Sequence, residues 1–110
     1  MQIPNCEQAF IPAAKITGYL LDEAHPVGGA KAQFFRMFGF NEDSVDSLTQ
    51  GLLTLVCDND VIEILVSDFG TKYSVDGAIE TPIGRTIFIR TVWIIETAQD
   101  IPRFVTAYPQ

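Results

Sequence analysis

The spacing of apolar residues predicts three helices in the first half of the chain. The first follows Pro12, which suits a first helical turn, and the second ends at Gly39. A third is capped by Asn41 or Asp43. Their apolar positions recur three or four residues apart: Ile16, Tyr19 and Leu20, then Ala30, Phe34 and Phe38, then Val45, Leu48, Leu52, Leu55 and Val56. Each set forms one face of a helix, so we expect the three faces to be buried.

From residue 61 onward the hydrophobic pattern changes to that of strands, and we predict four of them: 61–66, 71–80, 85–96 and 103–108. The second has one polar face, formed by Lys72, Ser74, Asp76 and Glu80, as strands of antiparallel sheets often do. The third is apolar on both faces, so we expect it at the centre of the sheet, after a hairpin at Pro82–Gly84. Helices followed by strands predict one α+β domain over residues 1–110, with three N-terminal helices packed on a C-terminal four-stranded antiparallel sheet.

The composition indicates an ordered domain with more apolar residues than a small core needs. Hydrophobic residues make up 47% of the 110 residues and the mean hydropathy is +0.19, which suggests that a partner protein or a second copy covers part of the surface. The longest apolar runs fall far short of the roughly 20 residues of a membrane span. The first residues lack the basic start and apolar stretch of a secretory signal. We therefore expect a cytoplasmic protein with no membrane partner.

The acidic residues gather in the middle of the chain. The net charge is -7, and no lysine or arginine lies between Arg36 and Lys72. Such a surface repels nucleic acid and attracts basic partners. A solvated, solubilising face is the simpler interpretation, and we favour it.

The two cysteines, Cys6 and Cys57, are far apart in the sequence and form no local metal-binding pair. We expect two reduced thiols, at least one of them in the core, and no metal site. The common phosphate-binding, dinucleotide-binding and hydrolase motifs are absent, so no cofactor is expected.

Three charged or titratable residues are candidates for chemistry: His25, Lys31 and Arg90. His25 is the single histidine and lies in a loop, where most such residues are hydrogen-bonded for structural reasons. Lys31 follows two glycines at a helix start, so it either adds charge to an anion site or is a plain surface lysine. Arg90 lies in the middle of the predicted central strand, and it either pairs with a carboxylate such as Glu63 or Glu96 or binds a ligand.

The last predicted strand adds two candidates, Thr106 and Tyr108. Strand alternation places them together on one face and Arg103 on the other. Their polar tips either reach the same cleft as Arg90 or close the edge of the sheet, and we favour the second interpretation.

Five segments occur in an order that resembles a known family: His25–Ala32, Gly39-Phe40, Gly84–Thr86, Arg90–Trp93 and Pro102–Pro109. The family is an uncharacterised bacterial domain, found alone and at the C-terminus of large polymorphic-toxin or haemagglutinin-like proteins. No single motif is specific, but the resemblance runs from His25 almost to the C-terminus. It implies a toxin-like effector.

The predicted layout is also similar to that of barnase- and colicin-type ribonucleases, which cleave RNA without metal. Such a reaction needs a base, an acid and cations around the phosphate. By this resemblance His25 is the acid or base, Lys31 and Arg90 hold the phosphate, and Thr106 or Tyr108 orients it. Gly29 and Gln33 stand where members of the family carry basic residues, which leaves Lys31 with fewer neighbouring cations.

Three hypotheses therefore remain open. A metal-independent ribonuclease, with RNA as substrate, predicts that His25, Lys31 and Arg90 converge in one cleft. A non-catalytic interaction module, either a homodimer or the partner of a small protein, predicts that Arg90 is held in an ion pair, that His25 is remote from it, and that an apolar patch is exposed. A small-molecule binding domain predicts a pocket lined by Trp93 or Tyr108.

Overall fold

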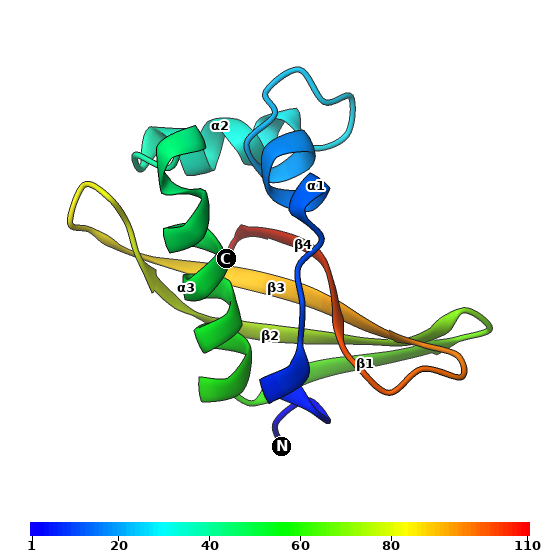
Figure 1. The fold of residues 1–110 in the computed structure, drawn as a ribbon. Helices are drawn as coiled ribbons and strands as arrows, with labels where there is room; N and C mark the ends of the chain where they lie inside the picture. Colours follow the sequence, from blue (N-terminus) through cyan, green and yellow to red (C-terminus); the bar gives the residue numbers. More distant parts are fainter.

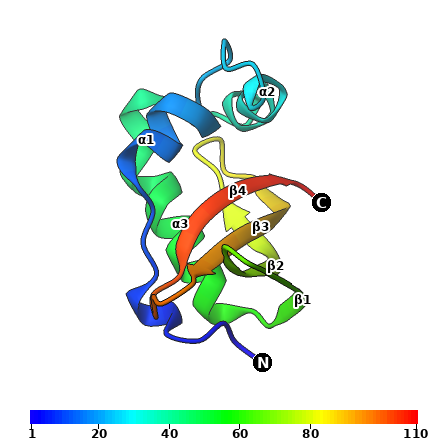
Figure 2. The ribbon, with the colours of Figure 1, turned by 90° about the vertical axis from the view of Figure 1, so that its right-hand side faces the viewer.

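The computed structural model describes residues 1–110 as one antiparallel sheet with helices on one face (Figures 1 and 2). The N-terminal half contains three α-helices and three tighter or wider helical turns, labelled η. Their bounds are η1 Cys6–Gln8, α1 Ala13–Lys15, η2 Ile16–Leu20, α2 Gly29–Met37, η3 Glu42–Ser44 and α3 Val45–Asp58. None of the helices has the length and apolar character that crossing a bilayer requires.

The three predicted helices are confirmed, with a difference in each of the first two. The expected buried face of the second is wrong: α2 buries Ala32 and Phe35, whereas Ala30 is exposed and Phe34 and Phe38 are half-buried. Pro12 precedes α1, but the helix widens after one turn into the π-helical η2, where the N–H of Leu21 bonds to the carbonyl of Ile16. Asn41 caps η3, which leads into α3: its side chain accepts from the N–H of Asp43. Gly39, after α2, has a φ of 95°, a conformation that glycine adopts without strain.

The sheet is a meander in which each strand pairs with the next along the chain. The strands are β1 Val61–Ser67, β2 Gly70–Glu80, β3 Thr86–Glu96 and β4 Arg103–Pro109, in the order β1-β2-β3-β4. All neighbours are antiparallel. This confirms the predicted α+β fold, the central place of β3 and the hairpin at Pro82–Gly84.

The two faces of the sheet differ in what covers them. On β3, Ile87, Ile89, Thr91 and Trp93 are buried toward the helices, whereas Phe88, Arg90 and Val92 lie on the opposite side. We call this second side, which no helix covers, the open face (Figure 2). α3 packs its buried stripe, Leu48, Leu52, Leu55 and Val56, against the covered face.

Two expectations need correction. Trp93 is fully buried, with its ring 5.2 Å from that of Phe104, so it is a core residue and lines no pocket. Arg103 was expected on the other face of the sheet from Thr106, but both residues lie on the open face. A bulge between β3 and β4 pairs Thr106 with Val92 and Arg103 with Ile94. Simple alternation fails here because the bulge adds one residue to β4.

Candidate functional site

Three side chains from distant parts of the chain meet at the β4 edge of the sheet. The Nζ of Lys31 donates to the hydroxyl of Tyr19 at 2.9 Å and to Oγ1 of Thr106 at 3.2 Å. The two hydroxyl oxygens lie 2.9 Å apart. Lys31 is in the first turn of α2, Tyr19 is in η2 and Thr106 is on the open face of β4. We call these three residues the Lys31 triangle.

The surroundings of the Lys31 triangle are aromatic and positively charged. The Nζ of Lys31 lies 5.6 Å from the centre of the Tyr108 ring, and the Nζ of Lys15 lies 4.7 Å from that of Tyr19. No carboxylate lies within ion-pair distance of either lysine. Although the protein is acidic overall, this corner carries two cations that are free to attract an anion.

The Lys31 triangle changes the acidity of Tyr19. Burial alone would raise the pKa of this phenol. Two effects outweigh burial and bring the pKa below its ordinary value. The first is the hydrogen bonds with Lys31 and Thr106, and the second is the positive charge of Lys31 and Lys15. Tyr19 therefore gives up its proton more readily than an ordinary tyrosine does.

His25 borders the Lys31 triangle but does not join it. Its ring packs edge-on against that of Tyr19, with centroids 5.1 Å apart. Its Nδ1 accepts the backbone N–H groups of Val27 and Gly28, at 3.1 and 3.0 Å, and so shapes the turn that leads into α2. Because Nδ1 is an acceptor in both bonds, the ring carries its proton on Nε2.

Arg90 forms an ion pair with Asp76, which was not among its predicted partners. Its Nε and Nη2 donate to the two carboxylate oxygens of Asp76 at 2.8 and 3.0 Å, across the β2–β3 pair. The pKa of Arg90 is raised, mainly because of these bonds and to a lesser degree through Tyr108. Neither Glu63 nor Glu96, the expected partners, contacts Arg90; Glu96 instead pairs with Arg103.

Tyr108 links Arg90 to the Lys31 triangle. It lies directly opposite Arg90 in the β3–β4 register, so both side chains are on the open face. The five predicted site residues are therefore connected through Tyr19 and Tyr108 and line no closed cleft: His25 packs on Tyr19, and Tyr108 lies beside Lys31 and opposite Arg90. The two cavities of the structure lie elsewhere: the larger, of about 350 Å³, is between α3 and β2.

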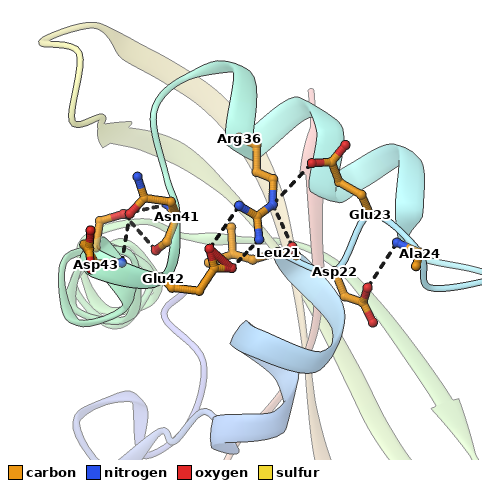
Figure 3. Close-up of polar contacts among 9 residues, drawn as sticks. Leu21, Asp22, Glu23, Ala24, Arg36, Asn41, Glu42 and Asp43 are labelled. Carbon is orange, nitrogen blue, oxygen red and sulfur yellow. Dashed lines mark hydrogen bonds and ion pairs between the residues drawn. The ribbon is translucent and has the colours of Figure 1, made fainter.

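Arg36 fixes the backbone that carries Tyr19 and His25 (Figure 3). From α2 it donates through Nε to the carbonyl of Leu21 at 2.8 Å, lies 3.5 Å from Glu23, and pairs with Glu42 at the start of η3. Its hydrogen bonds with Glu42 raise the pKa of Arg36 and lower that of Glu42. The loop between η2 and α2 is thus tied to two helices.

Gly28 lets the ring of Tyr19 lie against this loop. A Cβ at position 28 would stand 2.7 Å from Cε1 of Tyr19, closer than any real contact allows. Tyr19 was expected only as part of a buried helix face. Its hydroxyl was the available signal, because the hydroxyl of a tyrosine in a buried face usually has a hydrogen-bond partner.

Comparisons with known proteins place the fold. A family model described as "Domain of unknown function (DUF6883)" matches residues 2–110. No curated protein matches the chain. Among solved structures, a chain of a contact-dependent growth inhibition toxin–immunity protein complex from Klebsiella pneumoniae 342 is similar, with a TM-score of 0.74 and 13% sequence identity over 96% of each chain. At that identity, the similarity shows the fold alone.

Proposed function

The chain belongs to the DUF6883 family, and from this premise we propose that it is a toxin-like, metal-independent ribonuclease whose centre is the Lys31 triangle. The observation that carries the proposal is the contact of a lysine with a phenol of lowered pKa at a surface that is otherwise acidic. A chain of similar fold occurs in a toxin–immunity protein complex, which fits both this proposal and the interaction module considered below.

The reaction would use Tyr19 as the base. The phenolate takes the proton of a ribose 2′-hydroxyl, whose oxygen attacks the neighbouring phosphorus. The bond from phosphorus to the 5′-oxygen breaks, and the 5′-oxygen takes a proton from the hydroxyl of Tyr108. The products are a 2′,3′-cyclic phosphate and a 5′-hydroxyl. Water then carries a proton from Tyr19 to Tyr108, which restores the phenolate of Tyr19 and the phenol of Tyr108.

The cations at the site would hold the phosphate. Lys31 and the hydroxyl of Thr106 lie beside Tyr19 and can stabilise the negative charge that develops on the non-bridging oxygens. Asp76 occupies Nε and Nη2 of Arg90, which leaves the two N–H groups of Nη1 to bind a phosphate oxygen. In this scheme His25 is a positioning residue, because its Nδ1 is occupied by two backbone N–H groups.

The open face suits single-stranded RNA. Phe88 is 64% exposed on β3, two residues from Arg90. Together with Tyr108 it offers rings on which unpaired bases stack, and base stacking is a general means of binding single strands.

The test is cleavage of total RNA in EDTA at neutral pH by the wild type, Lys31→Met, Tyr19→Phe, His25→Ala and Gly18→Ala. We expect cleavage by the wild type and by Gly18→Ala, whose substituted position has no neighbour within 4 Å. Cleavage should fall at least about 100-fold in Tyr19→Phe and Lys31→Met. A 2′-deoxyribose at the cleaved position should abolish the reaction, since it removes the attacking hydroxyl.

Intact RNA with the wild type would overturn the proposal. It would favour the second candidate, a non-catalytic interaction module, to which the Arg90–Asp76 ion pair and the exposed apolar residues of β1 also point. If His25 positions Tyr19, His25→Ala should lower cleavage and raise the pKa of Tyr19 toward its ordinary value, and unchanged cleavage would contradict that role.

A further inference from the structure

β1 is an edge strand with an unusually apolar and exposed surface. It pairs only with β2, and residues 62–67 are all exposed. The exposed fractions are 47% for Ile64, 58% for Leu65 and 81% for Val66. The N–H of Val61 bonds to the carbonyl of Met1. The outer backbone groups of the rest of the strand have no strand beside them in this chain, so they can pair with another.

The position of the strand leaves it accessible. The β1–β2 hairpin extends beyond α3, at the right of Figure 1, with Phe69 81% exposed near its turn. Edge strands are usually protected from further pairing by lysine, proline or a covering helix. β1 contains neither lysine nor proline, and its single charge is Glu63. The bulge near Ile62 is its sole irregularity.

We propose that β1 pairs with β1 of a second copy, antiparallel and centred on Ile64, which joins two sheets into one of eight strands. This inference does not depend on the ribonuclease activity. The sequence of β1 is self-complementary in that register. Ile64 lies opposite Ile64 of the second copy, and Ile62 lies opposite Val66. Each of these apolar side chains would therefore face another apolar side chain, and both would be removed from water when the strands pair.

Charge favours a second copy over an unrelated acidic chain. In the proposed register Glu63 lies opposite Leu65 of the second copy, so the two glutamates do not face each other. Lys72 is the β2 neighbour of Leu65, on the same face. The side chain of each Glu63 would therefore extend past Leu65 of the other copy to Lys72 of that copy. The dimer would thus contain two Glu63–Lys72 ion pairs between the two acidic chains.

The proposed dimer also leaves the candidate site free. β1 and β4 are the opposite edges of the sheet, and the Lys31 triangle lies at the β4 edge. Two copies joined at β1 would carry their sites at the two far ends of the continuous sheet.

The test is the molecular mass of the protein in solution, measured by light scattering or sedimentation from about 1 to about 100 µM. The single chain has a mass of 12.2 kDa, and we expect twice that value at the upper end of the range. Ile64→Lys and Leu65→Lys should weaken the dimer at least about tenfold, because each places a charge in the buried pairing. Phe88→Lys, at an equally exposed apolar position on the central strand, is the matched control and should leave the dimer unchanged.

Three outcomes would overturn the proposal: a monomer over the whole range, a dimer that Ile64→Lys leaves intact, or a dimer that Phe88→Lys weakens equally. Circular dichroism of each variant confirms that it is folded. Slower hydrogen exchange of the β1 amides at high protein concentration is an independent readout, and absence of that change would also count against pairing at this edge.

Discussion

The hydroxyl groups of Tyr19 and Thr106, 87 residues apart in the sequence, lie 2.9 Å from each other. Lys31 bonds to both. This contact joins the first helical segment to the last strand, with α2 between them. It brings a phenol, an amine and an alcohol together at a place where the acidic chain is locally positive, and the first three predictions follow from it.

Tyr19 should titrate below the ordinary pKa of a tyrosine. Because its folded-state pKa lies below the ordinary value of about 10, the unfolded chain binds the proton more tightly. The ionised phenol therefore stabilises the folded state above that ordinary value, and this contribution is lost as the pH falls through the folded pKa. Ultraviolet absorbance of the phenolate measures the pKa, with Tyr19→Phe to assign it.

Lys31→Met should raise the pKa of Tyr19, because it removes both a hydrogen bond and a positive charge while keeping a side chain of similar length. Lys72→Met is the matched control, since Lys72 lies on β2, away from the Lys31 triangle. Equal effects of the two substitutions would show that net charge, and not the contact with Lys31, sets the acidity of Tyr19.

Gly28→Ala should displace the ring of Tyr19 without unfolding the protein. The new methyl group would stand 2.7 Å from Cε1 of Tyr19, so the ring has to move and its bonds to Lys31 and Thr106 lengthen. We expect a higher pKa for Tyr19 and at least about tenfold lower RNA cleavage. Gly18→Ala adds the same methyl group in open space, one residue from Tyr19, and should change neither quantity.

Thr91→Val should destabilise the core by about 1–3 kcal/mol. The buried Oγ1 of Thr91 accepts the indole N–H of Trp93 at 2.8 Å and donates to the carbonyl of Val75 at 2.7 Å. Valine fills the same space but leaves the carbonyl of Val75 and the indole N–H of Trp93 without this hydrogen-bond partner. Urea unfolding followed by tryptophan fluorescence measures the free energy. Thr91→Ser, which keeps the hydroxyl, should cost less, and the reverse order would refute the argument.

Cys57 should react slowly with alkylating reagents. Burial, and to a lesser degree the neighbouring Cys6, raises the pKa of its thiol to about 12. Since the thiolate is the reactive form, we expect alkylation at about pH 8 to be roughly 10³-fold slower than for a free cysteine. Mass spectrometry of peptides after timed exposure to iodoacetamide measures the rate. A rate like that of an exposed thiol would contradict the raised pKa.

The same shift has a consequence for stability at alkaline pH. The folded protein holds the Cys57 proton more tightly than the unfolded chain does. The resulting stabilisation is complete below the unfolded pKa of about 8.5 and is lost as the pH rises toward about 12. Cys57→Ala should remove this part of the pH dependence.

Local patterns were sufficient to predict most of the fold. The stripe of α3 and the alternation of β2 depend on spacing within one segment, and the structure confirms both. The π-helical turn at η2 was missed, because residues three and four apart share a face in either kind of helix. The bulge that brings Arg103 to the open face was missed because it arises where β4 pairs with β3, which spacing within β4 does not reveal.

The candidate site was predicted less completely for a related reason. Lys31, Thr106 and Tyr108 were identified as polar residues, but their contact depends on where α2 lies relative to β4 (Figure 2). The partner of Arg90 could have been found from the sequence. A hairpin centred on Ile83 pairs residue 76 with residue 90, and the structure has this register. Whether these residues act on RNA stays a prediction.

The Lys31 triangle can form only after β4, the last strand, has been synthesised. Translation makes Tyr19 and Lys31 before Thr106 in β4, because the chain is synthesised from its N-terminus. Every intermediate of translation that lacks β4 also lacks the third member of the triangle and the Tyr108 ring. Under the proposed function, such unfinished molecules would not cleave RNA while they are attached to the ribosome.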